Sequence, residues 1–454
     1  MHTAELPAND DIGTVTAFRG DVYSLSFTTR LLHGVLFGAV LTLGTKAEFN
    51  TVLGFLPLIS AALTCGMAIG TAADQIVRRR FHLKAASVLS AACGMIAIGF
   101  LLTGQDTSHL LLAASFSGLA VAGDWNFSMV AARQSLPTPQ RWRGLVGYSL
   151  AFSTGILLTI LATTAEFQHQ LLYVACVGLF MSSLVFCLRP PLVLKRPIVF
   201  HGTGQPDDGV PPLNAEFSTN AGSSFESPST DTESEECDET ECCGGKARDF
   251  QPTNFRHGVV ISTVGYLSLV VVFFIFAAPA FQTNQPWTAV MAAFGFTMGH
   301  LLVMTTAPRA GYAVATIPFL VLATPVALAT AIVPITSVWF AVCGLMLGLF
   351  GGGIAAGCSS IVGEQFSDCS TDKKRSRLVV MSLFSCSLIL LGEFTLCHFQ
   401  IDHRNLLMLN SLTFVVGVLA VRTIPTPLIS SLGNDGDVAD DDEELTDIIN
   451  ALKT

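Results

Sequence analysis

The chain has 454 residues, of which 51% are hydrophobic, 13% are charged and 39 are glycine. Soluble domains carry roughly 25% charged residues, and here the apolar residues gather into many blocks of about 20, the length that crosses a bilayer. This composition excludes a soluble enzyme, a nucleic-acid binder and a fibrous protein, and it predicts a polytopic membrane protein.

The net charge of −10 is unevenly distributed along the chain. Twelve of the 34 acidic residues lie in 207–249 and eight more in 435–447, which leaves fourteen for the rest of the chain against 24 Lys and Arg. The remainder of the chain is therefore basic. The segment 189–257 is rich in Ser, Thr, Asp, Glu, Pro and Gly and cannot bury a core, so it is predicted to be a disordered acidic linker.

Twelve apolar segments are predicted to cross the membrane as helices, since backbone polar groups in lipid must be paired within the segment. They are 27–43, 52–72, 85–102, 110–130, 145–165, 171–188, 259–278, 287–306, 313–333, 338–358, 378–399 and 406–421. The expected fold is an all-α polytopic membrane protein with twelve transmembrane helices in two six-helix bundles. The expected parts are an N-terminal segment 1–26, a bundle 27–188, the linker 189–257, a bundle 258–421 and an acidic tail 422–454.

Basic residues predict the orientation through the positive-inside rule. If the N-terminus is cytoplasmic, the cytoplasmic loops hold Arg78, Arg79, Arg80, Lys84, Arg133, Arg141, Arg143, Arg189, Lys195, Arg196, Arg309, Lys373, Lys374, Arg375 and Arg377. The external loops then hold only Lys46 and Arg404. We therefore expect a multi-pass protein of the cell membrane with both termini and the linker in the cytoplasm.

The loop after the second span carries a motif with a readable physical basis. It reads Gly70-Thr-Ala-Ala-Asp74-Gln-Ile-Val-Arg78-Arg79-Arg80. Gly70 permits close helix contact, Asp74 can cap a helix, and the arginines can pair with carboxylates or lipid phosphates. The segment resembles the signature G-x-L-a-D-r-x-G-r-k of the major facilitator superfamily, although Gln75 and Val77 depart from it. The resemblance implies that Gly70, Asp74 and the three arginines form a conformational latch.

A second resemblance follows the fourth span, where 136–147 contain Arg143 in a turn like the P-x-x-x-R-G turn of the superfamily. The resemblance makes Arg143 part of the same latch. Gly123 precedes Arg143 by twenty residues, and Gly353 precedes Lys373 by the same number. This echo suggests two similar halves. The resemblance covers the whole membrane body in topology and implies alternating access about a site between the halves.

Charged side chains inside membrane spans are expensive and mark candidate functional sites. Asp124 lies in the inner third of the fourth span, beside Asn126, and Arg30 lies near the inner end of the first span. Both spans line the central cavity in the superfamily, so the resemblance implies an Arg30–Asp124 pair that binds a charged substrate or gates the cytoplasmic mouth. In the alternative interpretation, Arg30 reaches the inner headgroups and Asp124 is a packing partner.

Glu393 is a further candidate, because it lies in the eleventh span among Leu, Phe and Gly. It could carry a coupling proton or serve only as an interhelical hydrogen-bonding acid. His33, His300 and His398 occupy three different spans. Single helical histidines are more often packed donors than ligands; His300 is kept with Asn126 as a candidate cavity residue.

No cofactor or metal is expected. The acidic run from Glu235 to Cys243 contains three thiols, but its spacing fits no zinc template, so it is interpreted as solvated linker. The chain lacks the phosphate-binding motif G-x-x-x-x-G-K-[ST], which argues against ATP-driven transport within this chain.

The sequence thus predicts a secondary active transporter rather than an enzyme. Few charges in the spans favour a small, weakly charged or amphipathic solute, with proton coupling through Asp124 or Glu393. The expected partners are this solute, protons and membrane lipids, with no nucleic acid, and the protein is expected to be monomeric. The alternatives are a transporter-like fold that acts as a sensor or as a chaperone for a pigment or partner protein, and a membrane-embedded transferase.

Overall fold

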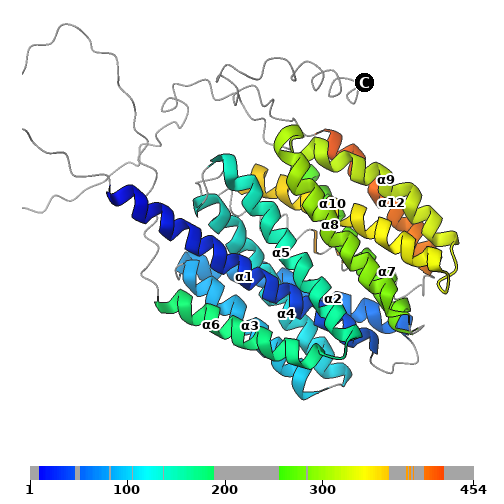
Figure 1. Ribbon diagram of the computed structural model, residues 1–454, viewed down its shortest axis with the longest axis horizontal. Coiled ribbons are helices and arrows are strands. Elements are labelled where there is room, and N and C mark those ends of the chain that lie inside the picture. Colours follow the sequence, from blue (N-terminus) through cyan, green and yellow to red (C-terminus); the bar gives the residue numbers. More distant parts are fainter. Residues whose placement is uncertain are drawn as a thin grey trace, which may run out of the picture. The chain divides into compact units, whose positions relative to one another are not determined.

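A computed structural model describes residues 10–46, 52–80, 83–104, 106–135, 138–188, 255–282, 285–367, 385–386, 388–389, 392 and 403–423. Within these ranges the chain consists of helices and short turns, without a strand. The helices are α1 (Asp10–Lys46), α2 (Val52–Arg80), α3 (Leu83–Thr103), α4 (Thr107–Ser135), α5 (Thr138–Thr164), α6 (Gln168–Leu188), α7 (Phe255–Gln282), α8 (Pro286–Ala310), α9 (Tyr312–Ile332), α10 (Val338–Ser367) and α12 (His403–Arg422). They lie side by side along a roughly common direction (Figure 1).

Eleven of the twelve predicted spans coincide with these helices, and the all-α prediction is confirmed for the described ranges. The predicted span 378–399 lies almost entirely outside the described residues, as do the linker and the acidic tail. One boundary differs clearly, because α1 begins at Asp10 rather than near residue 27. Its first turns contain Asp10, Asp11, Arg19 and Asp21. Hydropathy marks only the apolar part of a helix, so this polar extension was missed.

The described helices have the length and composition of membrane spans. Eight of them contain stretches long and apolar enough to cross a bilayer: Ser24–Leu43, Ala85–Thr103, Gly144–Thr164, Gln168–Leu188, Pro286–Ala307, Tyr312–Ile332, Val338–Val362 and Asn405–Arg422. Shorter apolar stretches lie in α2 and α7. Trp287 and Trp339, near the starts of α8 and α10, are each 70% exposed, as expected of aromatic anchors at a membrane interface.

Glycines let the backbones of α2 and α4 touch. A Cβ atom at Gly66 would overlap the carbonyl oxygen of Ser115, and one at Gly118 would overlap that of Leu63. Close backbone approach through small residues is a main source of helix association in lipid, where apolar side chains gain nothing from leaving water. Gly70 belongs to the same seam, since its Cβ would lie 2.8 Å from the carbonyl oxygen of Leu119.

The same seam recurs between α8 and α10. A Cβ at Gly295 would overlap the carbonyl oxygen of Leu345, and one at Gly348 would overlap that of Ala292. In both seams each glycine meets the residue three positions before its partner glycine. The contacts therefore equate Gly66 with Gly295 and Gly118 with Gly348. Counting five residues onward equates Gly123 with Gly353, the two glycines of the sequence echo.

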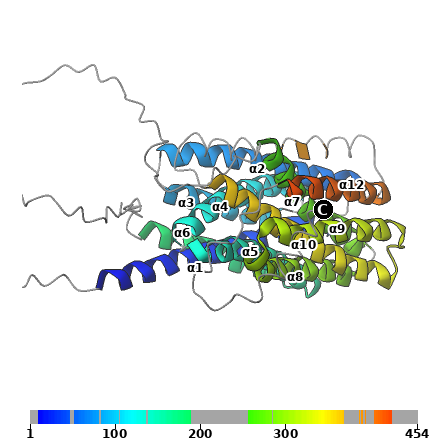
Figure 2. The same cartoon turned by 90° about the horizontal axis from the view of Figure 1, so that it is seen from above.

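Helix pairing repeats with a period of six helices. The pairs α3–α4, α3–α6, α1–α4 and α1–α6 have counterparts in α9–α10, α9–α12, α7–α10 and α7–α12. Figure 2 shows α3 beside α4 and α9 beside α10 from above. We call the helices from α1 to α6 the first repeat and the described helices from α7 to α12 the second repeat.

Among the described helices, contacts between the two repeats are made chiefly by α5 with α8 and by α1 with α7. Two side-chain contacts across this boundary are between hydroxyls. Thr64 Oγ1 on α2 lies 3.2 Å from the Tyr266 hydroxyl on α7, and Ser149 Oγ on α5 lies 3.4 Å from Ser359 Oγ on α10. These two contacts between the repeats are made by neutral side chains, whereas the glycine seams within each repeat are made by closely packed backbones.

Candidate functional site

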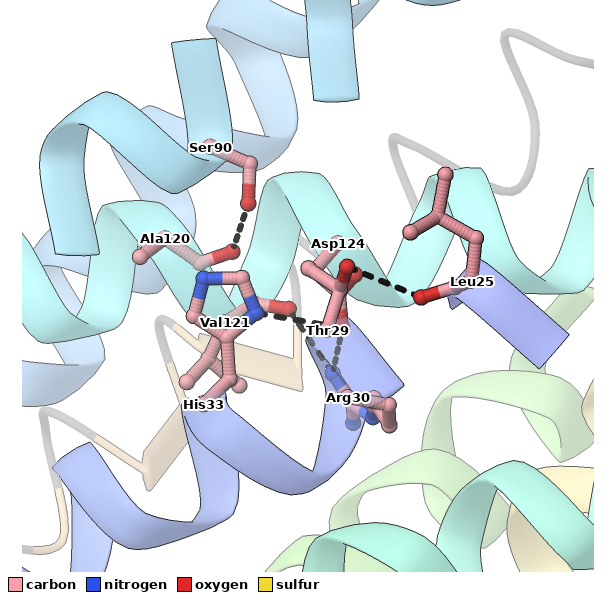
Figure 3. Close-up of polar contacts among 8 residues, drawn as sticks. All are labelled: Leu25, Thr29, Arg30, His33, Ser90, Ala120, Val121 and Asp124. Carbon is pink, nitrogen blue, oxygen red and sulfur yellow. Dashed lines mark hydrogen bonds and ion pairs between the residues drawn. The ribbon is translucent and has the colours of Figure 1, made fainter. Parts of the chain in front are cut away.

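A buried ion pair of the first repeat lies where α1 crosses α4. The Arg30 guanidinium donates from Nη1 to Oδ2 of Asp124 at 3.1 Å. The two side chains are 2% and 1% exposed. The sequence expectation that Arg30 pairs with Asp124 is thus met by the geometry, and the alternative in which Arg30 reaches the headgroups is not (Figure 3).

Arg30 is held on several sides. Nη1 also donates to the carbonyl oxygen of Val121 at 3.2 Å. The guanidinium carbon lies 4.5 Å from the ring centroid of Trp125 and 4.6 Å from that of Phe152. A cation between two aromatic faces gains electrostatic attraction from both rings. The charge is therefore enclosed by α4 and α5 rather than directed to an aqueous end of α1.

His33 is the third member of this group. Its Nδ1 lies 3.4 Å from the same Oδ2 of Asp124, and its side chain is fully buried. It is three residues beyond Arg30, so both side chains project from the same face of α1. We call Arg30, His33 and Asp124 the α1–α4 cluster.

Sequence reasoning considered His33 alone and did not retain it as a site residue. The signal that could have found it is the spacing to Arg30, because a histidine at i+3 from a buried arginine shares whatever carboxylate the arginine meets. Polar residues three or four positions apart in a membrane span lie on one helix face, so such pairs indicate a site better than single residues do.

Helix α3 closes the cluster from the other side. Ser90 Oγ donates to the carbonyl oxygen of Ala120 at 2.7 Å and ties α3 to α4 one turn before Asp124. A Cβ at Gly94 would lie 3.2 Å from Nε2 of His33. Gly94 therefore leaves just enough room for the imidazole between α1 and α3 (Figure 3 shows His33, Ser90 and Ala120).

The remaining candidates are not brought to this cluster. His300 is buried in α8, and its Nδ1 bonds to the carbonyl oxygen of Phe296 in the same helix at 2.9 Å; since a carbonyl only accepts, Nδ1 must be the protonated nitrogen. Asn126 follows Asp124 in α4, but its side chain lies outside the described residues, and so does Glu393. Their proposed roles stay predictions.

The latch residues are placed only in part. Asp74 is 6% exposed in α2, and Gly70 lies in the α2–α4 seam. Arg78, Arg79 and Arg80 end α2, and Arg143 lies in the first turns of α5, but the four side chains are outside the described set.

A buried ion pair in an apolar bundle calls for a chemical reason. Replacing such a pair by packed apolar residues is often neutral or stabilising, so stability alone gives weak grounds for keeping it. Ionisable groups in membrane helices mark substrate or ion pathways more often than scaffold. The α1–α4 cluster can hold an anion on Arg30, exchange a proton, or switch between paired and unpaired states.

These features define a polytopic, all-helical membrane protein with an ion pair enclosed between the helices of its first repeat. No protein-family model matches the sequence, and no curated protein sequence matches it. Solved structures do match. The human organic anion transporter MFSD10 (TETRAN) aligns with a TM-score of 0.57 at 15% identity, over 89% of this chain and 99% of that chain.

Two further similar structures are of one transporter. The E. coli fucose:proton symporter FucP aligns with a TM-score of 0.56 at 10% identity, over 89% of this chain and 98% of that chain. A second FucP structure, a major facilitator superfamily transporter in the outward conformation, gives 0.55 at 12% identity over 89% and 99%. At these identities the similarity establishes the fold. The chain has the fold of the major facilitator superfamily, as the motif resemblance implied.

Proposed function

We propose that this protein is a secondary active transporter that carries a small solute across the membrane by alternating access, driven by protons. The single observation that carries the proposal is the buried Arg30–Asp124 pair within a transporter fold. The structural neighbours support the class, since those described above are transporters by title.

The chemistry of the pair supports a weakly charged or amphipathic solute. Arg30 offers one positive charge flanked by Trp125 and Phe152, which suits a molecule with a polar group on an apolar body. One neighbour is titled an organic anion transporter and another a fucose:proton symporter. A singly charged or neutral solute is compatible with both of these titles and with the Arg30–Asp124 pair.

The contacts between the repeats support alternating access. The hydroxyl contacts Thr64–Tyr266 and Ser149–Ser359 join the repeats through neutral groups. Each contributes about 0.5–1.5 kcal/mol in net terms, so these contacts can open and re-form during a cycle. The tighter glycine seams lie inside each repeat and keep its helices together.

The proposal includes the orientation. We propose that both termini and the linker 189–257 face the cytoplasm of the cell membrane, because the basic loops gather on that side. Labelling of single introduced cysteines in intact cells tests this. A linker cysteine that reacts with an impermeant external reagent overturns the orientation.

A flux assay tests the function. Candidate solutes are first ranked by the thermal shift that they give to the purified protein in detergent. The best are then offered to proteoliposomes with and without an inward proton gradient. We expect accumulation above equilibrium only with the gradient, and loss of accumulation in Asp124→Asn with exchange or binding retained. Equal accumulation by the parent and by Asp124→Asn would contradict coupling through this acid.

A second candidate function follows from the burial of the pair. Arg30 and Asp124 are at most 2% exposed, which also suits a sensor or a partner-protein chaperone that keeps its charges closed. In that case the purified protein binds a ligand or partner without any net flux. The same proteoliposomes distinguish the two, because a sensor gives a thermal shift and no accumulation.

A further inference from the structure

We infer that His33 is the proton-binding residue of the α1–α4 cluster, and that its protonation frees Arg30 to hold the anionic group of an organic substrate. This inference rests on the proposed proton-coupled transport and deepens it in two ways. It moves the coupling proton from the carboxylate to an imidazole, and it names an organic monoanion with an apolar body as the substrate class.

The argument begins with one shared acceptor atom. Nη1 of Arg30 lies 3.1 Å and Nδ1 of His33 lies 3.4 Å from the same oxygen, Oδ2 of Asp124. The shorter contact is a hydrogen bond. The imidazole is at ion-pair distance, but neither of its ring nitrogens makes a hydrogen bond within the described residues. Asp124 Oδ2 therefore has two basic side chains at ion-pair distance, and the contact with Arg30 is the shorter one.

Protonation of Asp124 itself is unfavourable in this arrangement. It would leave the Arg30 guanidinium buried without its counter-charge, which is strongly destabilising. Protonation of His33 has the opposite effect, because the new imidazolium lies beside an existing carboxylate. A neutral imidazole that becomes charged at ordinary pH is the usual proton-binding group of proteins.

Few other groups compete for this role. Around His33, α4 contributes Asp124, α1 itself contributes Arg30, and α3 contributes Ser90 and Gly94. Within the described chain, Asp124 is the acid at ion-pair distance from His33. A proton on His33 therefore interacts with one carboxylate and one guanidinium, which sets up a direct exchange of partners.

The exchange follows from counting charges. With neutral His33 the cluster sums to zero; with a bound proton it sums to +1, and Asp124 can pair with the imidazolium instead of Arg30. An uncompensated buried charge is unfavourable, so a substrate carrying −1 restores neutrality. Proton and anion therefore each favour the binding of the other, and this linkage is reciprocal. A proton and an organic anion would be carried in the same direction.

The surroundings of Arg30 suit such an anion. Its Nε has no hydrogen-bond partner among the described residues, so donor capacity remains after Asp124 leaves. The rings of Trp125 and Phe152 lie 4.5 and 4.6 Å from the guanidinium carbon. Both rings are apolar and match the hydrocarbon part of a carboxylate such as benzoate.

Trp125 also provides the readout. In a variant with Trp142→Phe, Trp287→Phe and Trp339→Phe, Trp125 is the remaining tryptophan among the four of the sequence. Movement of the Arg30 cation relative to its ring should change its fluorescence. We expect one emission transition when the pH is lowered and His33 takes up its proton. His33→Gln and His33→Asn, two neutral replacements, should abolish it.

A matched control lies on α4. His109 Nδ1 is 3.8 Å from the exposed carboxylate of Asp106, so His109→Gln removes a histidine–aspartate contact elsewhere on the same helix. It should leave the Trp125 transition unchanged. Both His33 variants are first checked for a single symmetrical peak in size-exclusion chromatography, and either one suffices for the test.

Benzoate and the neutral benzamide test the substrate class. Saturating benzoate should raise the midpoint of the Trp125 transition by about one pH unit, which is a tenfold coupling, whereas benzamide should not. If a folded His33 variant keeps the transition, the proton binds elsewhere and the inference is overturned, whether or not the parent accumulates solute. If benzoate acts no differently from benzamide, the anion assignment is overturned. Absence of proton-driven flux in the parent instead contradicts the proposed function, and the Trp125 titration is still read independently.

Discussion

The α2–α4 pair and the α8–α10 pair have the same backbone contacts but different interiors. The glycine seams match residue for residue, with Gly66 equivalent to Gly295 and Gly118 to Gly348. In the same register Asp124 corresponds to Ile354, which is fully buried. A seam needs only the absence of a side chain, so it recurs in both repeats, whereas at this position the first repeat has a buried acid and the second has an aliphatic residue.

The difference separates scaffold from chemistry. The register also equates Asp74 of the latch motif with Val303, which is fully buried. Both acids of the first repeat that the sequence singled out therefore have aliphatic counterparts in the second. At these two equivalent positions the second repeat has packed aliphatic side chains where the first has buried acids.

The largest expected effect comes from removing the charge that distinguishes the first repeat. Asp124→Asn leaves Arg30 buried without a counter-charge and should destabilise the protein by about 3–5 kcal/mol, measured as thermal denaturation in detergent. Uphill transport should be lost. The double variant Arg30→Gln/Asp124→Asn should recover part of the stability without recovering uphill transport. If the double variant is no more stable than the single one, the two side chains do not act as a pair.

The latch acid should have the next largest effect. The predicted latch role requires Asp74 to make a charge-assisted contact, and such a contact contributes roughly 1.5–3 kcal/mol. Asp74→Asn should therefore shift the equilibrium between open states by tenfold or more and slow turnover. Reactivity of cysteines introduced at the outer mouth should fall. Asp106→Asn removes an acid that is 83% exposed and serves as the control. Unchanged reactivity and normal turnover in Asp74→Asn would leave the motif without a mechanical role.

The seams themselves give a test that should not distinguish the repeats. Gly66→Ala and Gly295→Ala each place a methyl group against a carbonyl oxygen, and overpacking of this kind destabilises by about 1–3 kcal/mol. Gly99→Ala is the control, because a Cβ there meets nothing within 4 Å. The temperature of thermal denaturation should fall by similar amounts for Gly66→Ala and Gly295→Ala, and it should not fall for Gly99→Ala. A large fall in denaturation temperature for only one of the two variants would contradict the equivalence of the α2–α4 and α8–α10 seams.

The smallest expected effect concerns the boundary between the repeats. Thr64→Val removes the hydroxyl that meets Tyr266 and should change the balance of open states by about 0.5–1.5 kcal/mol. Thr103→Val removes a hydroxyl bonded within its own helix α3 and should leave that balance alone. Labelling rates at cysteines on both mouths measure the shift. Equal rates in the two variants would mean that the Thr64 contact does not hold the repeats together.

Much of the fold could be predicted because lipid makes strict demands. Each span must be a long apolar helix, so hydropathy found α2 to α10 and α12 to within several residues. The polar start of α1 could not be predicted in this way, because hydropathy marks only the apolar part of a helix. The echo of Gly123 and Gly353 was visible in the sequence, but a glycine reveals only that something comes close, and the structure was needed to show which helix.

The site was predictable as a pair and not as a cluster. Arg30 and Asp124 could be paired because each is anomalous in an apolar span and the fold resemblance brings their helices together. A single histidine in a helix is more often a packed donor than a ligand, so His33 could not be assigned from its own position in the sequence. The enclosure of Arg30 by Trp125 and Phe152 depends on the rotation of α4 and α5 about their axes, which composition does not specify.

The hydroxyl contacts between the repeats have a kinetic consequence. When Ser149 and Ser359 part, a water molecule can take the place of each lost partner with nearly the same enthalpy. At this contact the parted and joined arrangements then differ little in energy. Wetting and drying of the Ser149–Ser359 contact would therefore accompany each movement of the two repeats without a large barrier at that point.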